Sequence, residues 1–106
     1  MTQDFDSAHF YDANGNPAGG QSTAVGISIN WQNGPLCVDG TRKEPNGAFV
    51  ETVLAIARDR LKFYQQGKFN CEKNTLAIDA INEALRHLND RTRDREERGV
   101  EGTHAV

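Results

Sequence analysis

The 106-residue sequence has few of the residues that define several large classes of protein. Its two cysteines, Cys37 and Cys71, are too few for a disulfide-built mini-protein, and no CxxC or Cys/His cluster suggests structural zinc. No apolar run approaches the roughly 20 residues of a membrane span. The N-terminus, residues 1–6, is acidic where a signal peptide is basic. We therefore expect one small cytoplasmic domain without a membrane segment.

Basic charge is also scarce. Twelve Lys and Arg residues face fifteen Asp and Glu residues, which gives a formal net charge of −3 at pH 7. Residues 1–44 hold five acidic and two basic residues, whereas residues 45–106 hold ten of each. A protein that binds duplex nucleic acid usually carries a clear basic surplus. Nucleic acid is therefore disfavoured as the main partner.

Groups of residues typical of catalysis are missing as well. The three histidines, His9, His87 and His104, are far apart in the sequence, and neither cysteine has a histidine beside it. The pair Glu96 and Glu97 lies among arginines, so both carboxylates should be ionised. The glycines form no phosphate-binding loop of the Walker or Rossmann type. The sequence predicts no catalytic residues, no metal site and no cofactor.

The turn-forming residues are unevenly distributed along the chain. All three prolines and seven of the ten glycines lie at or before position 47, and helix-patterned stretches follow. This shift predicts an α+β fold: a small N-terminal antiparallel β-sheet or hairpin, then a long antiparallel two-helix hairpin. We expect the arm and sheet to occupy residues 1–44. The helical hairpin, with a short C-terminal tail, should occupy residues 45–106.

Alternating apolar and polar residues locate the strands of the first half. Val25, Ile27, Ile29 and Trp31 alternate with smaller or polar residues, which is typical of a half-buried strand. The dipeptide Asn33-Gly34 would turn this strand back on itself. In order, we expect a loose arm over residues 1–8, a strand over 9–11, a loop over 13–20, a strand over 25–32 and a return strand over 36–38.

Helical spacing and capping residues predict two helices of unequal length. Asn46 is a candidate N-cap for a helix over Ala48–Gln66, and a second helix should run from about residue 70 to Gly99. At 1.5 Å per residue these helices measure ~28 and ~40 Å. The longer helix overhangs its partner with nothing in the chain to pack against it. A homo-oligomer is the physical expectation, most simply a two-fold dimer.

Two groups of residues in the hairpin could bind a ligand. Arg91, Arg95 and Arg98 recur at i, i+4 and i+7 on one side of the second helix. Their planar, permanently charged guanidinium groups match phosphate oxygens. The plainer alternative is a solvated face with internal Glu–Arg pairs.

The second group lies in the segment that joins the helices. Tyr64, Phe69 and Asn74 fall in it, and aromatic faces stack on bases for roughly 1–3 kcal/mol each. An asparagine amide can read a base edge or a ribose hydroxyl. Alternatively, Phe63 and Phe69 fill a core and Asn70 caps a helix. Asn74 and Arg91 are ~25 Å apart along one helix, so only an antiparallel dimer would join both groups around a small nucleotide.

The second half of the sequence resembles a family of phage proteins. The resemblance covers about the last 60 residues and rests on Arg58-Asp59-Arg60-Leu61-Lys62-Phe63-Tyr64-Gln65, on Lys68-Phe69-x-Cys71-x-x-Asn74, and on Ala84-Leu85-x-x-Leu88-x-x-Arg91-Thr92-x-x-Arg95-x-x-Arg98-Gly99-Val100-Glu101-Gly102-Thr103-His104. The family is that of the Thoeris anti-defence proteins of the first type. These share a helical hairpin domain with the anti-CBASS sponge of the second type.

The resemblance implies a function that involves no catalysis. Such sponges bind and hold cyclic nucleotide immune signals, namely cyclic ADP-ribose isomers or cyclic oligonucleotides, in the cytoplasm of the host cell. The resemblance implies a ligand pocket between subunits, in which Arg91 and Arg95 contact the phosphates of the ligand and Tyr64 and Asn74 contact its other parts. It also implies assembly up to a hexamer. With Phe69 and Arg98, these residues form our candidate ligand-binding set. The alternative is a regulatory or structural phage protein whose hairpin binds a protein partner.

Overall fold

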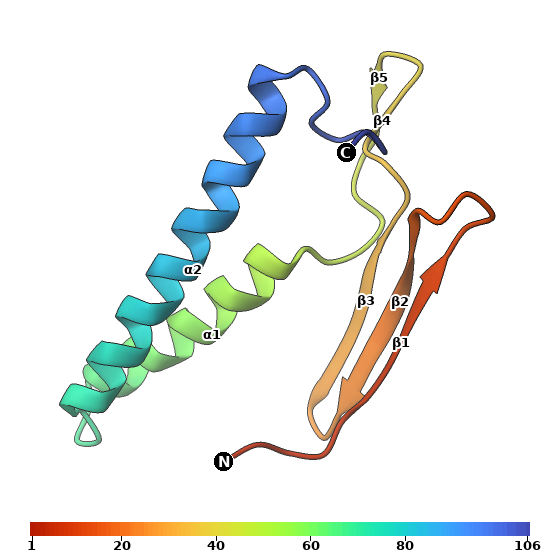
Figure 1. Ribbon diagram of the computed structural model, residues 1–106. Helices are drawn as coiled ribbons and strands as arrows, with labels where there is room; N and C mark the ends of the chain where they lie inside the picture. The colour runs from red at the N-terminus through yellow and green to blue at the C-terminus, as the bar shows by residue number, and fades with distance from the viewer. The chain divides into compact units, whose positions relative to one another are not determined.

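The computed structural model describes residues 1–106 and has the α+β fold that the composition predicts (Figure 1). Five strands precede two helices. The strands are β1 (Asp6–Tyr11), β2 (Pro17–Ala24), β3 (Ile27–Asn33), β4 (Cys37–Val38) and β5 (Thr41–Arg42), and the helices are α1 (Val50–Gln65) and α2 (Glu72–Glu97). Neither helix has the length and apolar character that crossing a membrane requires.

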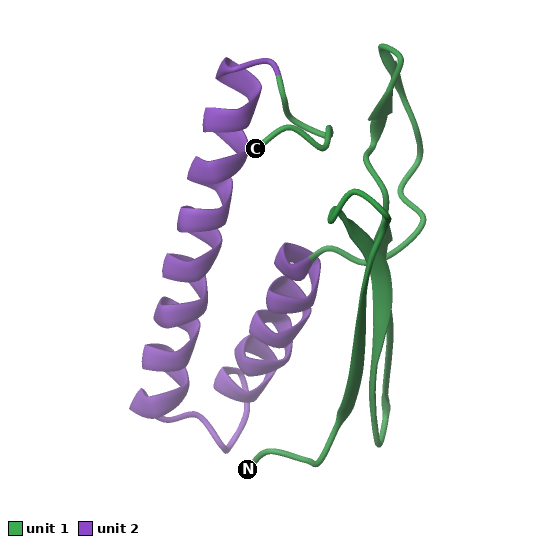
Figure 2. Ribbon diagram, turned by 45° about the vertical axis from the view of Figure 1, so that its right-hand side comes forward, with its two compact units in different colours: residues 1–49, 100–106 green, residues 50–99 purple.

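The chain forms two compact units (Figure 2). One unit combines residues 1–49 with residues 100–106, and the other is the helical hairpin of residues 50–99. The sequence pattern placed the C-terminal tail with the helices, whereas the contacts place it with the strands. The Cys37 N–H donates to the Gly102 carbonyl (2.8 Å), and Arg42 forms an ion pair with Glu101 (2.7 Å).

The first unit contains an antiparallel three-stranded sheet in the order β1-β2-β3. Ser7, Ser22 and Ile29 lie side by side across the three strands. The Ser22 hydroxyl lies 2.7 Å from that of Ser7 and accepts a hydrogen bond from Trp31 Nε1 (2.9 Å). The sheet is a meander, in which each strand pairs with the strand that precedes or follows it in the sequence.

Three sequence-based expectations about this sheet were wrong. The expected loop over residues 13–20 contains the whole first half of the central strand β2, residues 17–20. β1 begins at Asp6 within the expected loose arm, and Val25 and Gly26 form the turn before β3. Glycine weakens most strands, which is why the Gly19-Gly20 pair indicated a loop. Here Gly20 is needed, because a Cβ on it would lie 2.1 Å from the Ala8 carbonyl oxygen.

The return strand also pairs differently from the prediction. β4 does not return along β3; it pairs with β5 in a separate two-stranded sheet, with Cys37 opposite Arg42. Asp39 and Gly40 connect these strands, and both have positive φ angles (51° and 76°). Two consecutive left-handed residues give the tight hairpin turn that matches strand twist. Asn33-Gly34 instead leads into Pro35, which has no N–H for a strand ladder.

The linker before α1 is held against β3. The Ala48 N–H donates to the Asn30 carbonyl (2.7 Å), and the Gln32 N–H donates to the Ala48 carbonyl (3.1 Å). Asn46 does not cap the helix as expected. Its side-chain Oδ1 accepts from the Asn33 N–H and its Nδ2 donates to the Asn33 carbonyl, both at 2.8 Å. Both polar atoms of the Asn46 side-chain amide are therefore bonded to Asn33 and do not cap the helix. α1 begins only at Val50.

The second unit is the expected antiparallel hairpin of unequal helices (Figure 1). α1 has 16 residues and α2 has 26, so at 1.5 Å per residue they measure ~24 and ~39 Å. The apolar side chains at helical spacing in α2 are only half-buried: Ile78, Ile81, Leu85 and Leu88. No residue of either helix is fully buried.

The interior of the chain is small. Leu36, with 9% of its surface exposed, is its one buried apolar residue. Large apolar side chains remain exposed in both units, including Phe10 (55%) in the sheet and Ile56 (66%) and Leu76 (51%) in the hairpin. A small sheet and a pair of helices offer too few apolar layers for a core of ordinary size.

Candidate functional site

The turn between α1 and α2 forms an open pocket with aromatic walls. Its volume is about 490 Å³. α1 contributes the first two lining residues from its last turn, and the connecting segment contributes the others: Phe63, Tyr64, Gln66, Gly67, Lys68 and Phe69. The rings of Phe63 and Tyr64 lie 5.9 Å apart at an angle of 56°. The pocket therefore offers tilted aromatic faces to a flat ligand.

Two cationic side chains lie over these rings. The Arg60 guanidinium is 4.7 Å from the centre of the Phe63 ring and 5.0 Å from that of Tyr64. Arg60 Nε also donates to the Tyr64 hydroxyl (3.3 Å). The Lys68 ammonium is 5.6 Å from the centre of the Phe69 ring. Aromatic faces and permanent positive charge together suit a ligand that carries both a base and an anionic group.

A network of side-chain amides holds this turn together. Gln65 Oε1 accepts from the Cys71 N–H and Asn74 Nδ2, both at 3.0 Å. Gln65 Nε2 donates to the Cys71 carbonyl (3.0 Å) and to the Thr75 hydroxyl (2.8 Å). Asn74 Nδ2 also donates to the carbonyl of Phe69 (3.2 Å). The end of α1 is thus joined to the start of α2 and to one wall of the pocket.

The structure brings three of the six predicted ligand-binding residues to this turn. Tyr64 and Phe69 line the pocket, and Asn74 lies on the first turns of α2 and contacts the backbone of Phe69. The alternative that Phe63 and Phe69 fill a core is wrong for the single chain, because 57% and 71% of their surfaces are exposed. Sequence reasoning missed Gln65 and Arg60, whose roles depend on contacts across the turn.

The three predicted arginines lie at the other end of α2. Arg91 is exposed and Arg95 is half-buried, and Arg98 Nε donates to the Asp94 carboxylate (3.1 Å). Seventeen residues separate Asn74 from Arg91 in the same helix, which corresponds to ~25 Å. One chain therefore does not unite the arginines with the aromatic pocket.

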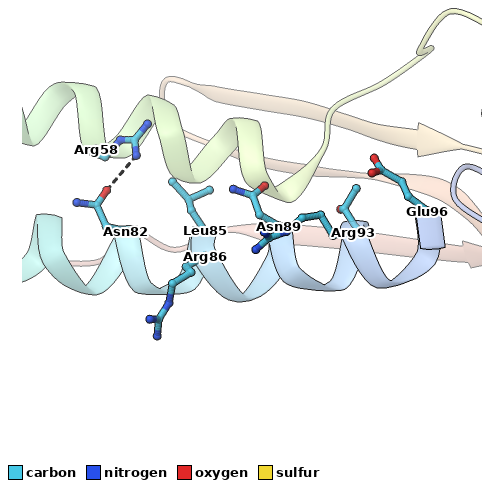
Figure 3. A pocket seen from close by; sticks show the side chains of 8 residues that line it. Arg58, Asn82, Leu85, Arg86, Asn89, Arg93 and Glu96 are labelled. Carbon is cyan, nitrogen blue, oxygen red and sulfur yellow. Dashed lines mark hydrogen bonds between the residues drawn. The ribbon is translucent and has the colours of Figure 1, made fainter. Parts of the chain in front are cut away.

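A second, more polar groove of about 550 Å³ runs between the two helices (Figure 3). Arg58 reaches across from α1 to Asn82 on α2, where its guanidinium donates to Asn82 Oδ1 (2.9 Å). The sequence contained a signal for this groove, because its α2 residues recur at helical spacing. They are Asn82, Leu85, Arg86, Asn89, Thr92, Arg93 and Glu96.

The charges of this groove are largely compensated. Arg86 forms an ion pair with Glu83 and Arg93 forms one with Asp90, each three residues apart on α2. Glu96 adds a further negative charge to the lining. The groove thus offers an anion less positive charge than its three arginines suggest. The chain contains no group of three or more His, Cys, Asp or Glu side chains arranged to hold a metal ion.

Comparison with known proteins places this hairpin in a family. Residues 27–93 match the family described as the Acb2/Tad1 hairpin domain, which is more than half of the chain. The chain belongs to the Acb2/Tad1 hairpin family. It is 44% identical over 77 residues, 73% of its length, to Thoeris anti-defense 1 of Bacillus phage SBSphiJ7. It spans about half (51%) of that relative's length.

The part of this Acb2/Tad1 chain that matches the family includes the whole turn. It begins at β3 and ends on α2, so it covers Tyr64, Phe69, Asn74 and Arg91. Arg95 and the residues after it follow the matched segment. The pocket at the turn is therefore a feature of the hairpin itself and independent of the C-terminal tail.

Proposed function

We propose that this chain is a phage or prophage anti-defence sponge. It binds and sequesters cyclic nucleotide immune signals, cyclic ADP-ribose isomers and also cyclic oligonucleotides, and it releases them unchanged. The observation that carries the proposal is the open aromatic pocket with two cations at the turn of an Acb2/Tad1 hairpin. The 44% identity to a protein named Thoeris anti-defense 1 supports the anti-defence role. Such a sponge acts where the signals are made, in the cytoplasm of the host cell.

The chemistry of the pocket supports a nucleotide as the ligand. A base stacks on Tyr64 or Phe69, and stacking on an aromatic side chain contributes roughly 1–3 kcal/mol. Guanidinium groups match phosphate oxygens, and the turn itself holds one such group in Arg60. The three arginines that are predicted to bind the phosphates lie too far away in the same chain: Arg91, Arg95 and Arg98. We propose that a second copy of the chain supplies them by antiparallel pairing of two hairpins.

The exposure of apolar side chains supports a homo-oligomer. Ile56 and Leu76 expose 66% and 51% of their surfaces, although they belong to the hairpin unit. Exposed apolar surface of this kind marks protein–protein contacts. A two-fold dimer is the smallest assembly that closes two equivalent nucleotide pockets, and three such dimers would give the hexamer that the family resemblance implies.

Thermal unfolding in the presence of candidate ligands tests the proposal. The panel comprises a glycosidic cyclic ADP-ribose isomer, linear ADP-ribose, cyclic di-GMP, a mixed cyclic dinucleotide and cyclic triadenylate. A ligand at 100 times its Kd stabilises the folded state by about 2.7 kcal/mol, which raises the Tm of a domain of this size by about 10 °C or more. The ligand should be recovered intact after denaturation.

Variants identify the residues responsible. Arg91→Ala/Arg95→Ala should abolish the rise in Tm, whereas Lys62→Ala/Lys73→Ala removes two other exposed positive charges of the hairpin and should retain it. Light scattering should show a dimer or a larger assembly. A flat panel for a folded protein would refute the sponge and favour a hairpin that binds a protein partner.

A further inference from the structure

Gln65 has a side-chain orientation that the backbone determines. The N–H of Cys71 can only donate and its carbonyl can only accept, and both contact the Gln65 amide at 3.0 Å. Gln65 Oε1 must therefore face the Cys71 N–H, and Nε2 must face the Cys71 carbonyl. Exchanging the two amide atoms would break both hydrogen bonds and place like groups against each other.

This orientation determines that of Asn74 in turn. Asn74 Nδ2 donates to Gln65 Oε1 (3.0 Å) and to the carbonyl of Phe69 (3.2 Å). Both partners are acceptors, so an exchanged Asn74 amide would set its own oxygen against two oxygens. Both Nδ2 hydrogens are thus used within the protein. The Oδ1 atom is the part of the Asn74 amide that makes no hydrogen bond in the chain.

We propose that Gln65 is a positioning residue for the nucleotide site, which fixes Asn74 so that its side chain offers a ligand an acceptor only. Position 74 then recognises a donor, either a ribose hydroxyl or the exocyclic amino group of adenine. It does not contact a phosphate oxygen or an unprotonated ring nitrogen, since both are acceptors. This inference rests on the proposed function for the identity of the ligand and for its contact with Asn74, but the orientation of Asn74 is a property of the free protein.

Gln65 also has a structural role that the test must separate from positioning. α2 begins without a side-chain cap, because Cys71 occupies the N-cap position and makes no capping hydrogen bond. Gln65 anchors that first turn from α1 instead. A variant that lowers Tm alone would therefore not distinguish the two roles, and a readout of amide orientation and of ligand discrimination is needed.

The first experiment uses the full chain without ligand. Side-chain amide exchange measured by NMR should show slow exchange for Asn74 Nδ2 in the wild type. Exchange should be at least tenfold faster in Gln65→Ala. Gln65→Glu should give an intermediate rate, because it keeps an acceptor for Asn74 but sets an oxygen against the Cys71 carbonyl. Lys73→Ala, a neighbouring exposed residue without a hydrogen bond in this network, serves as the control. Equal protection of Asn74 in Gln65→Ala would overturn the positioning role.

The second experiment measures ligand discrimination in the same variants. The tightest nucleotide of the panel is compared with its deoxyribose form and with the form in which hypoxanthine replaces adenine. The wild type should bind at least one of the two altered nucleotides about tenfold more weakly than the parent nucleotide. In Gln65→Ala, this ratio of Kd values should fall below about threefold. Equal binding of all three nucleotides by the wild type, or an unchanged ratio in Gln65→Ala, would overturn the inference.

The two experiments also separate this inference from the function on which it rests. If the wild type binds no nucleotide of the panel, the proposed function and the donor specificity both fail. The amide exchange of the free protein would still decide whether Gln65 orients Asn74. If nucleotides bind but Asn74 is unprotected, the sponge stands and the positioning role of Gln65 is refuted.

Discussion

Replacing Tyr64 by alanine should weaken nucleotide binding by a factor that the pocket geometry allows us to estimate. The ring lies 5.9 Å from that of Phe63 and 5.0 Å below the Arg60 guanidinium, and 37% of the residue is exposed. Loss of one stacking platform costs roughly 1–3 kcal/mol of binding energy, which is about a 5- to 160-fold rise in Kd. Stability should fall by only about 1 kcal/mol, because an exposed cation–π contact contributes little.

Tyr64→Phe separates the ring from its hydroxyl. This variant keeps the stacking face and loses only the hydrogen bond from Arg60 Nε (3.3 Å). Its Kd should therefore stay within about threefold of the wild type, since an exposed hydrogen bond contributes about 1 kcal/mol or less. Tyr11→Ala is the matched control, because that ring is 74% exposed on β1, outside the pocket.

Calorimetric titration with the tightest nucleotide of the panel measures all three variants. Circular dichroism at the titration temperature confirms that each remains folded. A folded Tyr64→Ala protein with the wild-type Kd would show that this ring does not stack on the ligand. If Tyr64→Phe raises the Kd as much as Tyr64→Ala does, the hydroxyl is the recognition element and the stacking argument fails.

Three further substitutions test the sheet unit, each by urea unfolding. Gly20→Ala should destabilise it by about 3 kcal/mol or more, because φ is 142° and the new Cβ would lie 2.1 Å from a β1 carbonyl oxygen. Gly102→Ala should cost about 1–2 kcal/mol, since φ is 76° and the Cβ would approach the Cys37 sulfur to 3.0 Å. The hydrogen bond from the Asn16 N–H is the main cause that lowers the pKa of Asp12 below 3.8. Asp12→Ala should therefore destabilise the unit at pH 7 and progressively less as pH falls below about 4; a destabilisation that grows on acidification would contradict the lowered pKa.

Local sequence patterns predicted the helical hairpin well. The two helices were expected over Ala48–Gln66 and from about residue 70 to Gly99, and they run over Val50–Gln65 and Glu72–Glu97. Helix formation depends on contacts three and four residues apart, so spacing and terminal residues carry most of the information. The sequence also placed Tyr64 and Phe69 in the segment that joins the helices, and both line the pocket at the turn.

The sheet was predicted less well because strand pairing is decided between segments. Gly19 and Gly20 indicated a loop by composition, yet the close approach of β1 requires a glycine in the central strand. Asn46 suited an N-cap, but its amide pairs with the backbone of Asn33 instead. In both cases the deciding partner lies more than ten residues away, where composition and period carry no signal.

Composition and short-range spacing are enough to predict the α+β class, the unequal helical hairpin and the aromatic character of its turn. The tertiary structure adds the contacts through which these residues act together. It returns the tail to the strands through the contact of Cys37 with Gly102, and it seats Arg60 over two rings. It also sets Asn74 Nδ2 against two acceptors of the chain, Gln65 Oε1 and the Phe69 carbonyl. Hydrogen-bond direction and ring contacts depend on the positions of atoms in space, which no pattern of residue types specifies.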